Sequence, residues 1–287
     1  MNHHALRPRP QERRPPPQPH PRRLHGFRNI AGTPGSADDS APDLAAGISL
    51  QAERLERMIR AVSIVGMDAE TPPGRVVVVI DVIRAFTTAA VAFERGVTEI
   101  ACAPSVEVGR ALHRLLPDRL LVGETNGLKP VDFNVGNSPF EMSAARLDGQ
   151  RLIQATSNGT LGLARCPDPT ALLAVSARNV GATARWIASN HAETPRTLIC
   201  TGRTAEDWAC ATYLSGLLNG SAPRRADLIA GIMSGAAEHA RCYAQLPASE
   251  RVDLSNDLRF CCDVDRAEFA MVGDVRKDHV VLAKVPC

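Results

Sequence analysis

The sequence predicts an α/β fold, in which a layered sheet carries helices on both faces. Short apolar runs alternate with segments of helical periodicity from residue 47 onward, the order expected of strands and covering helices. The run "RVVVVI" at 75–80 is β-branched and follows "TPPG", which marks the start of a strand. Of the 287 residues, 44% are hydrophobic and 22% charged, which is enough apolar residues for an ordinary core.

The expected elements follow one another along most of the chain. The strand at 75–80 leads into a helix at 84–96, whose last residue, Gly96, suits a helix C-terminus. Further strands are expected at 98–103, 119–123, 151–156, 171–175, 196–200 and 279–284, and further helices at 105–116, 138–147, 177–192, 205–220 and 226–246. Active sites of such sheets lie at the carboxyl ends of the strands.

Residues 1–46 have a different composition and are predicted to be a disordered Pro/Arg-rich tail, which leaves 47–287 as one α/β domain. The tail centres on "RPRPQERRPPPQPHPRR" and has no apolar periodicity. A basic arm that contacts nucleic acid would look similar, but the rest of the chain lacks a basic, aromatic-interleaved surface. The tail lacks the apolar segment of a secretory signal, and no stretch approaches the ~20 apolar residues of a membrane span. Neither nucleic acid nor membrane is therefore an expected partner.

The cysteines and histidines give little sign of a metal site. None of the eight cysteines forms a CxxC pair, so a zinc site is not supported, and reduced thiols of a cytoplasmic protein are expected. Outside the tail, the histidines lack ligand spacing and are expected at the surface or in the core. They are His113, His191, His239 and His279.

Four expected strands run directly into polar or charged groups. These are Asp81 and Arg84 after the first strand, Glu124 and Lys129 after "RLLVG", Thr156 to Thr160 after "RLIQA", and Thr201, Gly202 and Arg203 after "RTLIC". If the strand ends converge, the two carboxylates face Arg84, Lys129 and Arg203 across one cleft. Such a mixture suits a divalent cation together with an anionic substrate.

Each of these groups also has a local structural interpretation. Asp81 suits the cap of the following helix, and Ser138 with Glu141 forms a capping box that explains both residues. Asn137, just before that cap, could present a backbone N–H to an anion. The turn "TSNGT" either cradles an anionic group with successive N–H donors or is only a turn. Glu206 and Asp207 could be first-turn carboxylates of a helix capped by Thr204.

Several motifs together resemble those of one family. "IDVIRAFTTA", "GETNGLKPVDFNVGNSPFE", "TSNGTLGL", "GRTAEDWACA" and "DLRFCCDVD" have the order and approximate spacing of the 2-phosphosulfolactate phosphatase family, also called the ComB family. The similarity spans nearly all of 75–265, and it implies that 47–287 is an α/β phosphatase-like catalytic domain. It implies a Mg²⁺-dependent phosphoric monoester hydrolase that converts 2-phospho-3-sulfolactate and water into 3-sulfolactate and phosphate, a step on a route to coenzyme M.

The resemblance also implies a set of site residues. The polar signature of the family falls on Asp81, Arg84, Thr87, Glu124, Lys129, Asn137, Ser138, Asn158, Gly159, Thr160, Arg203, Glu206 and Asp207. We expect Asp81 and Glu124 to be catalytic and to hold Mg²⁺. Substrate binding is expected of Arg84, Lys129, Asn137, Ser138, Asn158, Gly159, Thr160 and Arg203. The three cations among them would share the phosphoryl, sulfonate and carboxylate charges.

The sequence leaves alternatives open. A water activated by the metal and a covalent aspartyl-phosphate on Asp81 are both compatible with these residues. A non-catalytic binder of a small phosphorylated acid, or a phosphatase of another 2-phosphorylated acid, would retain the same groups. The chain has only two Trp and two Tyr, which favours a small, highly charged substrate over a base or sugar. The oligomeric state is left open, a homo-oligomer included.

Overall fold

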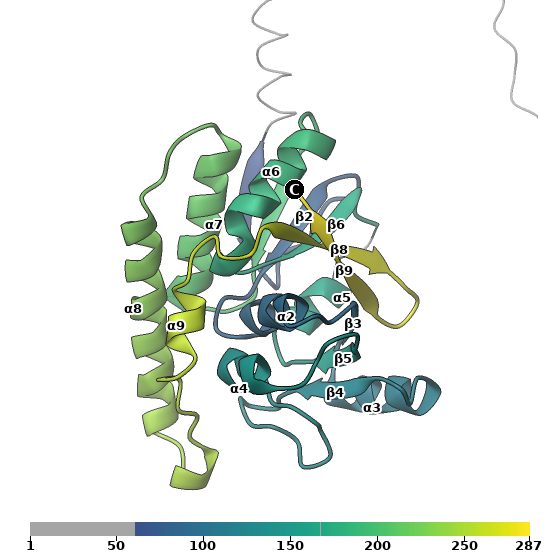
Figure 1. Ribbon diagram of the computed structural model, residues 1–287. Helices are drawn as coiled ribbons and strands as arrows, with labels where there is room; N and C mark the ends of the chain where they lie inside the picture. The colour runs from purple at the N-terminus through teal and green to yellow at the C-terminus, as the bar shows by residue number, and fades with distance from the viewer. Residues whose placement is uncertain (1–60, 167) are drawn as a thin grey trace, which may run out of the picture. The chain divides into compact units, whose positions relative to one another are not determined.

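A mixed sheet of nine strands organises the part of the protein that the computed structural model describes, residues 61–166 and 168–287 (Figure 1). These residues belong to one compact unit, Ile48–Cys287. The tail expected at 1–46, and the first residues of the expected catalytic domain, lie outside the described residues. No helix in the described ranges has the length and apolar character needed to cross a membrane.

The sheet is parallel except for one inserted hairpin. Its strands are β1 Val62–Gly66, β2 Val76–Ile80, β3 Glu99–Ala103, β4 Leu120–Gly123, β5 Arg151–Ala155, β6 Ala171–Val175, β7 Arg196–Cys200, β8 Phe269–Val275 and β9 Val280–Pro286. They are ordered β1-β7-β2-β6-β8-β9-β3-β5-β4. The hairpin β8–β9 is antiparallel to β6 on one side and to β3 on the other, so it separates two parallel groups of strands.

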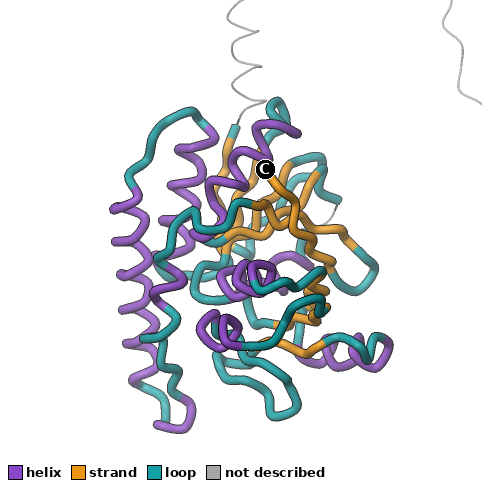
Figure 2. The backbone as a smooth tube through the Cα atoms, viewed as in Figure 1, coloured by secondary structure: helices purple, strands orange, loops and turns teal. Residues whose placement is uncertain are grey.

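Helices follow most of the strands, as the periodicity predicts (Figure 2). They are α2 Ala85–Glu94, α3 Val106–Leu115, α4 Pro139–Ala144, α5 Gly159–Ala164, α6 Val180–Asn190, α7 Ala205–Leu218, α8 Arg225–Ala244 and α9 Leu258–Cys261. The α/β fold class is therefore confirmed. The sequence patterns did not predict β1, β8, α5 or α9. The "TSNGT" segment, interpreted as a turn, begins the short helix α5.

Both faces of the sheet are buried, and β2 shows this residue by residue. Val77 and Val79 join the core cluster on the face of α2, whereas Val76, Val78 and Ile80 join the cluster on the face of α6, α7 and α8. A strand covered on both sides has no position for a polar side chain, which explains the unbroken apolar run. The first polar residue after the run, Asp81, therefore comes where β2 leaves the core.

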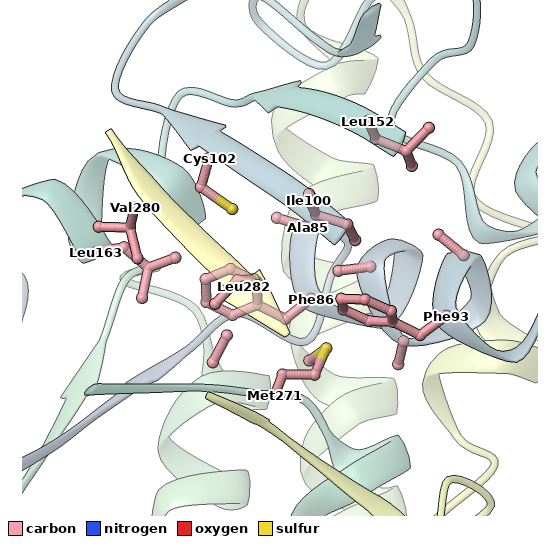
Figure 3. Packing of buried hydrophobic residues seen from close by; sticks show 14 of the residues in the cluster. Ala85, Phe86, Phe93, Ile100, Cys102, Leu152, Leu163, Met271, Val280 and Leu282 are labelled. Atoms are coloured by element: carbon pink, nitrogen blue, oxygen red, sulfur yellow. The ribbon is translucent and has the colours of Figure 1, made fainter. Parts of the chain in front are cut away.

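The sheet curves around α2, and this curvature brings separated strand ends together. Phe86 of α2 belongs to one cluster with Val77 of β2, on one side of the hairpin, and with Ile100 and Leu152, on the other. Figure 3 shows Phe86 beside Leu282 of the hairpin strand β9, within reach of Ile100 and Leu152. At the carboxyl edge, Gln154 Nε2 of β5 donates a hydrogen bond of 2.9 Å to the Ala85 carbonyl at the start of α2. The ends of β2 and β5 thus meet although four strands lie between them in the sheet.

Candidate active site

A cavity of about 650 Å³ lies where the ends of β2, β4 and β5 meet. Its wall opposite the strand ends comes from the second half of α8 and the segment after it. The polar lining residues are Asp81, Arg84, Glu124, Asn126, Asn137, Thr156, Ser157, Asn158, His239, Tyr243 and Glu250. The sequence predicts one cleft shared by Asp81, Glu124, Arg84, Lys129 and Arg203, and the first three of these line this cavity.

Asp81 is held at the end of β2 by groups on both sides of its carboxylate. Its side chain is 5% exposed. Oδ1 accepts a hydrogen bond of 2.9 Å from the Ala85 backbone N–H, so Asp81 does stabilise the start of α2. Oδ2 lies 3.3 Å from the Thr201 hydroxyl at the end of the neighbouring strand β7. Helix stabilisation and a place in the cavity are therefore combined in one residue.

Two further carboxylates lie behind Asp81, at the first turn of α7. Asp207 and Glu206 are each 2% exposed. Asp207 accepts backbone hydrogen bonds of 2.8 Å from Val82 and from Gly202, and the Thr201 hydroxyl lies 3.2 Å from its Oδ2. Asp207 thus joins the loops after β2 and β7. Local reasoning gave both carboxylates only a first-turn role, because it shows neither the packing of Gly235 of α8 against Glu206 nor the contact between Asp207 and the loop after β2.

Glu206 has one satisfied and one unsatisfied oxygen. Its Oε1 accepts hydrogen bonds from the Thr204 hydroxyl at 2.7 Å and from His239 Nε2 at 2.8 Å. Its Oε2 is buried and has no hydrogen-bond partner within the described residues. A carboxylate oxygen that is removed from water without a partner costs free energy, and this one packs against Gly235 of α8 rather than lining the cavity.

The negative charges of this cluster perturb one another. Burial is the main reason that the pKa of Asp81 is raised from 3.8 to about 6, and the nearby carboxylates Glu206 and Glu124 raise it further. The pKa of Asp207 is raised well above its usual value, first by burial and then by Asp81 and Glu206. A cation placed among these carboxylates would relieve the repulsion, which is the electrostatic requirement of a divalent metal site.

Glu124 is fixed by backbone donors from two loops. Its Oε1 accepts a hydrogen bond of 2.6 Å from the Ser157 N–H, and its Oε2 accepts one of 2.6 Å from the Gly127 N–H. The side chain is 7% exposed and lines the cavity. Glu124 therefore joins the loop after β4 to the loop after β5 and keeps its carboxylate at the cavity wall.

Arg84 lines the cavity, and Asp257 holds its guanidinium in place. Nη1 donates to Asp257 Oδ2 at 2.9 Å, and Nη2 donates to the Gly127 carbonyl at 2.8 Å. The Ser138 hydroxyl donates to Asp257 Oδ1 at 2.5 Å. These contacts use two of the five guanidinium donors and leave others for an anion. The expected cap is present as well, because Ser138 Oγ accepts from the Glu141 N–H.

The other predicted cations lie outside the lining of this cavity. Lys129 Nζ donates to the Phe133 carbonyl at 3.1 Å, and the residue lines an adjoining cavity of about 360 Å³. Arg203 is 97% exposed, with Asp68 at 3.9 Å. Asn137 lines both cavities, and its buried Oδ1 has no partner in the described ranges. The structure therefore brings Arg84 and Asn137 to the carboxylates, whereas Lys129 and Arg203 lie apart.

The "NGT" residues take different positions at the start of α5. Asn158 is the first residue before the helix and lines the cavity. Gly159 leaves no room for a side chain, since a Cβ there would lie 2.7 Å from Ala85 Cβ and 2.8 Å from Asp81 Oδ2. Thr160 is fully buried, and its hydroxyl accepts a hydrogen bond of 2.8 Å from the Thr156 N–H. Gly159 thus permits close approach, and Thr160 fixes the turn.

Residues of α8 complete the cavity, and sequence reasoning did not place them there. His239 and Tyr243 lie one turn apart and both line the cavity, with ring centroids 6.1 Å apart. The sequence offered one usable signal, a spacing of four residues through Gly231, Gly235, His239 and Tyr243, which places them on one helix face. That spacing alone does not tell which neighbour the face packs against.

The residues present fit a magnesium ion that takes only one or two ligands from the protein, which is the coordination that this ion usually has. No three His, Cys, Asp or Glu side chains in the described part converge as a ready-made metal cage. Magnesium is commonly held by one or two carboxylates, with waters and substrate phosphate oxygens completing the shell. Asp81 and Glu124 in the cavity wall meet that requirement.

The motif resemblance agrees with comparisons to known proteins. A family model described as 2-phosphosulpholactate phosphatase matches residues 66–274. Proteins named "Probable 2-phosphosulfolactate phosphatase" are similar, from Thermus thermophilus (38% identical over 145 residues), Deinococcus radiodurans (33% over 144) and Bacillus subtilis (32% over 151). The matches cover 50% to 52% of this chain and 60% to 66% of those relatives, so the chain spans less than two thirds of their length. Because the family model covers most of the chain, including Asp81, Glu124, Glu206 and Asp207, the chain belongs to the 2-phosphosulfolactate phosphatase family.

Proposed function

We propose that the protein is a Mg²⁺-dependent phosphomonoester hydrolase that acts on 2-phospho-3-sulfolactate and releases 3-sulfolactate and phosphate. The observation that carries the proposal is the buried carboxylate cluster around Asp81, which faces Arg84 across one cavity. Uncompensated carboxylates call for a divalent cation, and a cation beside an arginine suits a phosphoryl group. The names of the similar proteins support the substrate.

The proposed mechanism assigns Asp81 and Glu124 to the metal. Bound Mg²⁺ would neutralise charge on the phosphoryl oxygens, which bear most of the negative charge in the transition state. Arg84 would donate to the same oxygens from the other side. Its contacts to Asp257 and to the Gly127 carbonyl hold the guanidinium in place before the substrate binds, so little reorganisation accompanies the reaction.

The direct test is phosphate release from a panel of phosphorylated acids, with 2-phosphosulfolactate and 2-phospholactate both included, in the presence of Mg²⁺ and in the presence of EDTA. Release that requires Mg²⁺ and is fastest for the sulfonate supports the proposal. Equal rates for both acids would keep the phosphatase and remove the sulfonate specificity. Absence of release from every member by folded, Mg²⁺-supplied protein would contradict the proposal and favour a non-catalytic binder.

The two arginines that the sequence assigns to substrate binding provide a pair of variants, one at the cavity and one away from it. Arg84→Ala is expected to lower kcat/KM by about 100-fold, since it removes a charge-assisted contact in a buried setting. Arg84→Lys keeps the charge without the planar fork and should recover part of that loss. Arg203→Ala is the comparison at an exposed position, and an increase in its KM would assign Arg203 to substrate binding, as the sequence predicts. Unchanged kinetics of Arg84→Ala would contradict the role of Arg84.

A further inference from the structure

The far wall of the cavity contains an imidazole fixed by a buried carboxylate. His239 Nε2 lies 2.8 Å from Glu206 Oε1 and 3.3 Å from the Thr204 hydroxyl. Because Thr204 already donates its proton to Glu206, the ring nitrogen is the donor in both contacts. The ring also lies nearly parallel to that of Tyr243, with an angle of 22° between them. These contacts fix the orientation of the imidazole.

The packing of α8 on α7 shows why this pair forms. A Cβ at Gly235 would overlap Glu206 Oε2, and a Cβ at Gly231 would overlap Ala209 Cβ. Two glycines one turn apart therefore let α8 approach the first turn of α7 until the helices touch. The next turn of the same face carries His239, which the close approach brings to Glu206.

The second ring nitrogen, Nδ1, is not engaged by any of the residues that the structure describes. His239 lines the cavity with a side chain that is 23% exposed, and no hydrogen bond of Nδ1 occurs within the described residues. A carboxylate bonded to one imidazole nitrogen stabilises the cation that carries a proton on the other nitrogen. Glu206 thus fixes the ring through Nε2 and leaves Nδ1 as the nitrogen without a protein partner in the described ranges.

Phosphate ester hydrolysis needs such a proton where the ester bond breaks. The transition state places negative charge on the leaving oxygen, and an alkoxide leaves slowly unless it is protonated. Arg84 is placed to donate hydrogen bonds to an anion and already holds Asp257 and the Gly127 carbonyl. Burial raises the pKa of Tyr243, which makes its hydroxyl a poor donor. Among the residues that line the cavity, His239 is the one with an imidazole side chain, which leaves it as the candidate proton donor.

We propose that His239, oriented by Glu206, donates the proton to the leaving oxygen of the substrate. The inference rests on the proposed phosphatase activity. Water forms the new bond to phosphorus as the bond from phosphorus to the ester oxygen breaks. The electron pair of that bond stays on the ester oxygen, which takes the Nδ1 proton and leaves as an alcohol. The attacking water releases one proton to solvent, and the imidazole regains one, so ester and water give alcohol and phosphate.

The test uses substrates that differ in their need for a proton. p-Nitrophenyl phosphate releases a stable anion, whereas 2-phospholactate releases an alkoxide. His239→Gln places an amide donor at the position of Nε2 and therefore keeps the contact with Glu206 without a transferable proton. It is expected to lower kcat/KM by about 100-fold or more for 2-phospholactate, the range of general acid catalysis, and by under about 10-fold for p-nitrophenyl phosphate. His191→Gln, a substitution at the end of α6, should match the parent on both esters.

The outcomes separate this inference from the activity on which it rests. Equal loss on both esters would show that His239 has a structural role and would overturn the inference while the phosphatase stands. A parent protein that hydrolyses neither ester would overturn the proposed function and the inference together. If His239→Gln does not fold, the parent protein provides the test through its rates on esters whose leaving alcohols differ in acidity. An effective proton donor makes the rate depend only weakly on the acidity of the leaving alcohol. A steep dependence in the parent would overturn the inference.

Discussion

Asp81→Asn is expected to abolish turnover and, in metal-free protein near pH 7, to raise the free energy of unfolding by up to about 3 kcal/mol. The lost activity follows from the removal of a carboxylate that is proposed to hold the metal and faces the substrate cavity. We expect kcat to fall by about 10³-fold or more. The gain in stability follows from the burial of the same carboxylate beside Glu206 and Glu124.

The sign of the stability effect follows from the raised pKa of Asp81. The folded protein holds the Asp81 proton with a pKa of about 6, whereas the ordinary value is 3.8. Protonation therefore stabilises the fold fully below about pH 4, and this contribution is lost as the pH rises through about 6. Asparagine carries no charge at any pH and retains an oxygen for the Ala85 N–H. Parent and variant should differ least near pH 4 and most near pH 7.

Urea unfolding of both proteins across this pH range, with EDTA, measures the effect. Adding Mg²⁺ should then stabilise the parent by about 2.7 kcal/mol at a concentration of 100 times Kd, with a smaller gain for the variant. This comparison reports metal binding without any assay of activity. Asp278→Asn, at an exposed position, is the control and should leave stability unchanged. An Asp81→Asn protein that is less stable than the parent near pH 7 would contradict the account of the cluster.

The sequence was sufficient to predict the strand-end residues because burial leaves a clear pattern. β2 is buried on both faces, so its residues are apolar until the strand leaves the core at Asp81. The same reasoning led from β4 to Glu124. The hairpin strand β8 escaped prediction because only its first three residues are buried, so it presents no long apolar run.

Side-chain direction was much harder to predict than position along a strand. Arg203 and Lys129 follow strands as Arg84 does, yet only Arg84 lines the central cavity. The direction of Arg84 is fixed by Asp257, which lies 173 residues later in the chain. Likewise, the burial of Glu206 depends on Gly235 of α8. Such long-range contacts leave no trace in local periodicity, so the second half of the site could not be predicted from it.

Gly123→Ala is expected to produce the largest loss of stability, about 3 kcal/mol or more. Gly123 ends β4 with a φ of 149°, and a Cβ in this conformation would overlap the Ala155 carbonyl oxygen at the end of β5. Overpacking against a rigid backbone costs about 1–3 kcal/mol, and an unfavourable φ costs a similar amount. The substitution would force apart two paired strands at the edge where Glu124 enters the cavity.

Gly149→Ala separates the two causes, because Gly149 also has a positive φ, 72°, but has open space around its Cβ position. We expect it to cost only about 1 kcal/mol, the penalty of the backbone conformation alone. Chemical unfolding measures both variants, and a similar loss for the two would contradict the argument from the Ala155 carbonyl. Where Gly123→Ala remains folded, Mg²⁺ should stabilise it less than the parent. Glu124 keeps its place in the cavity wall through donors on the loops after β4 and β5, and those loops stay in register only while the two strand ends remain in contact.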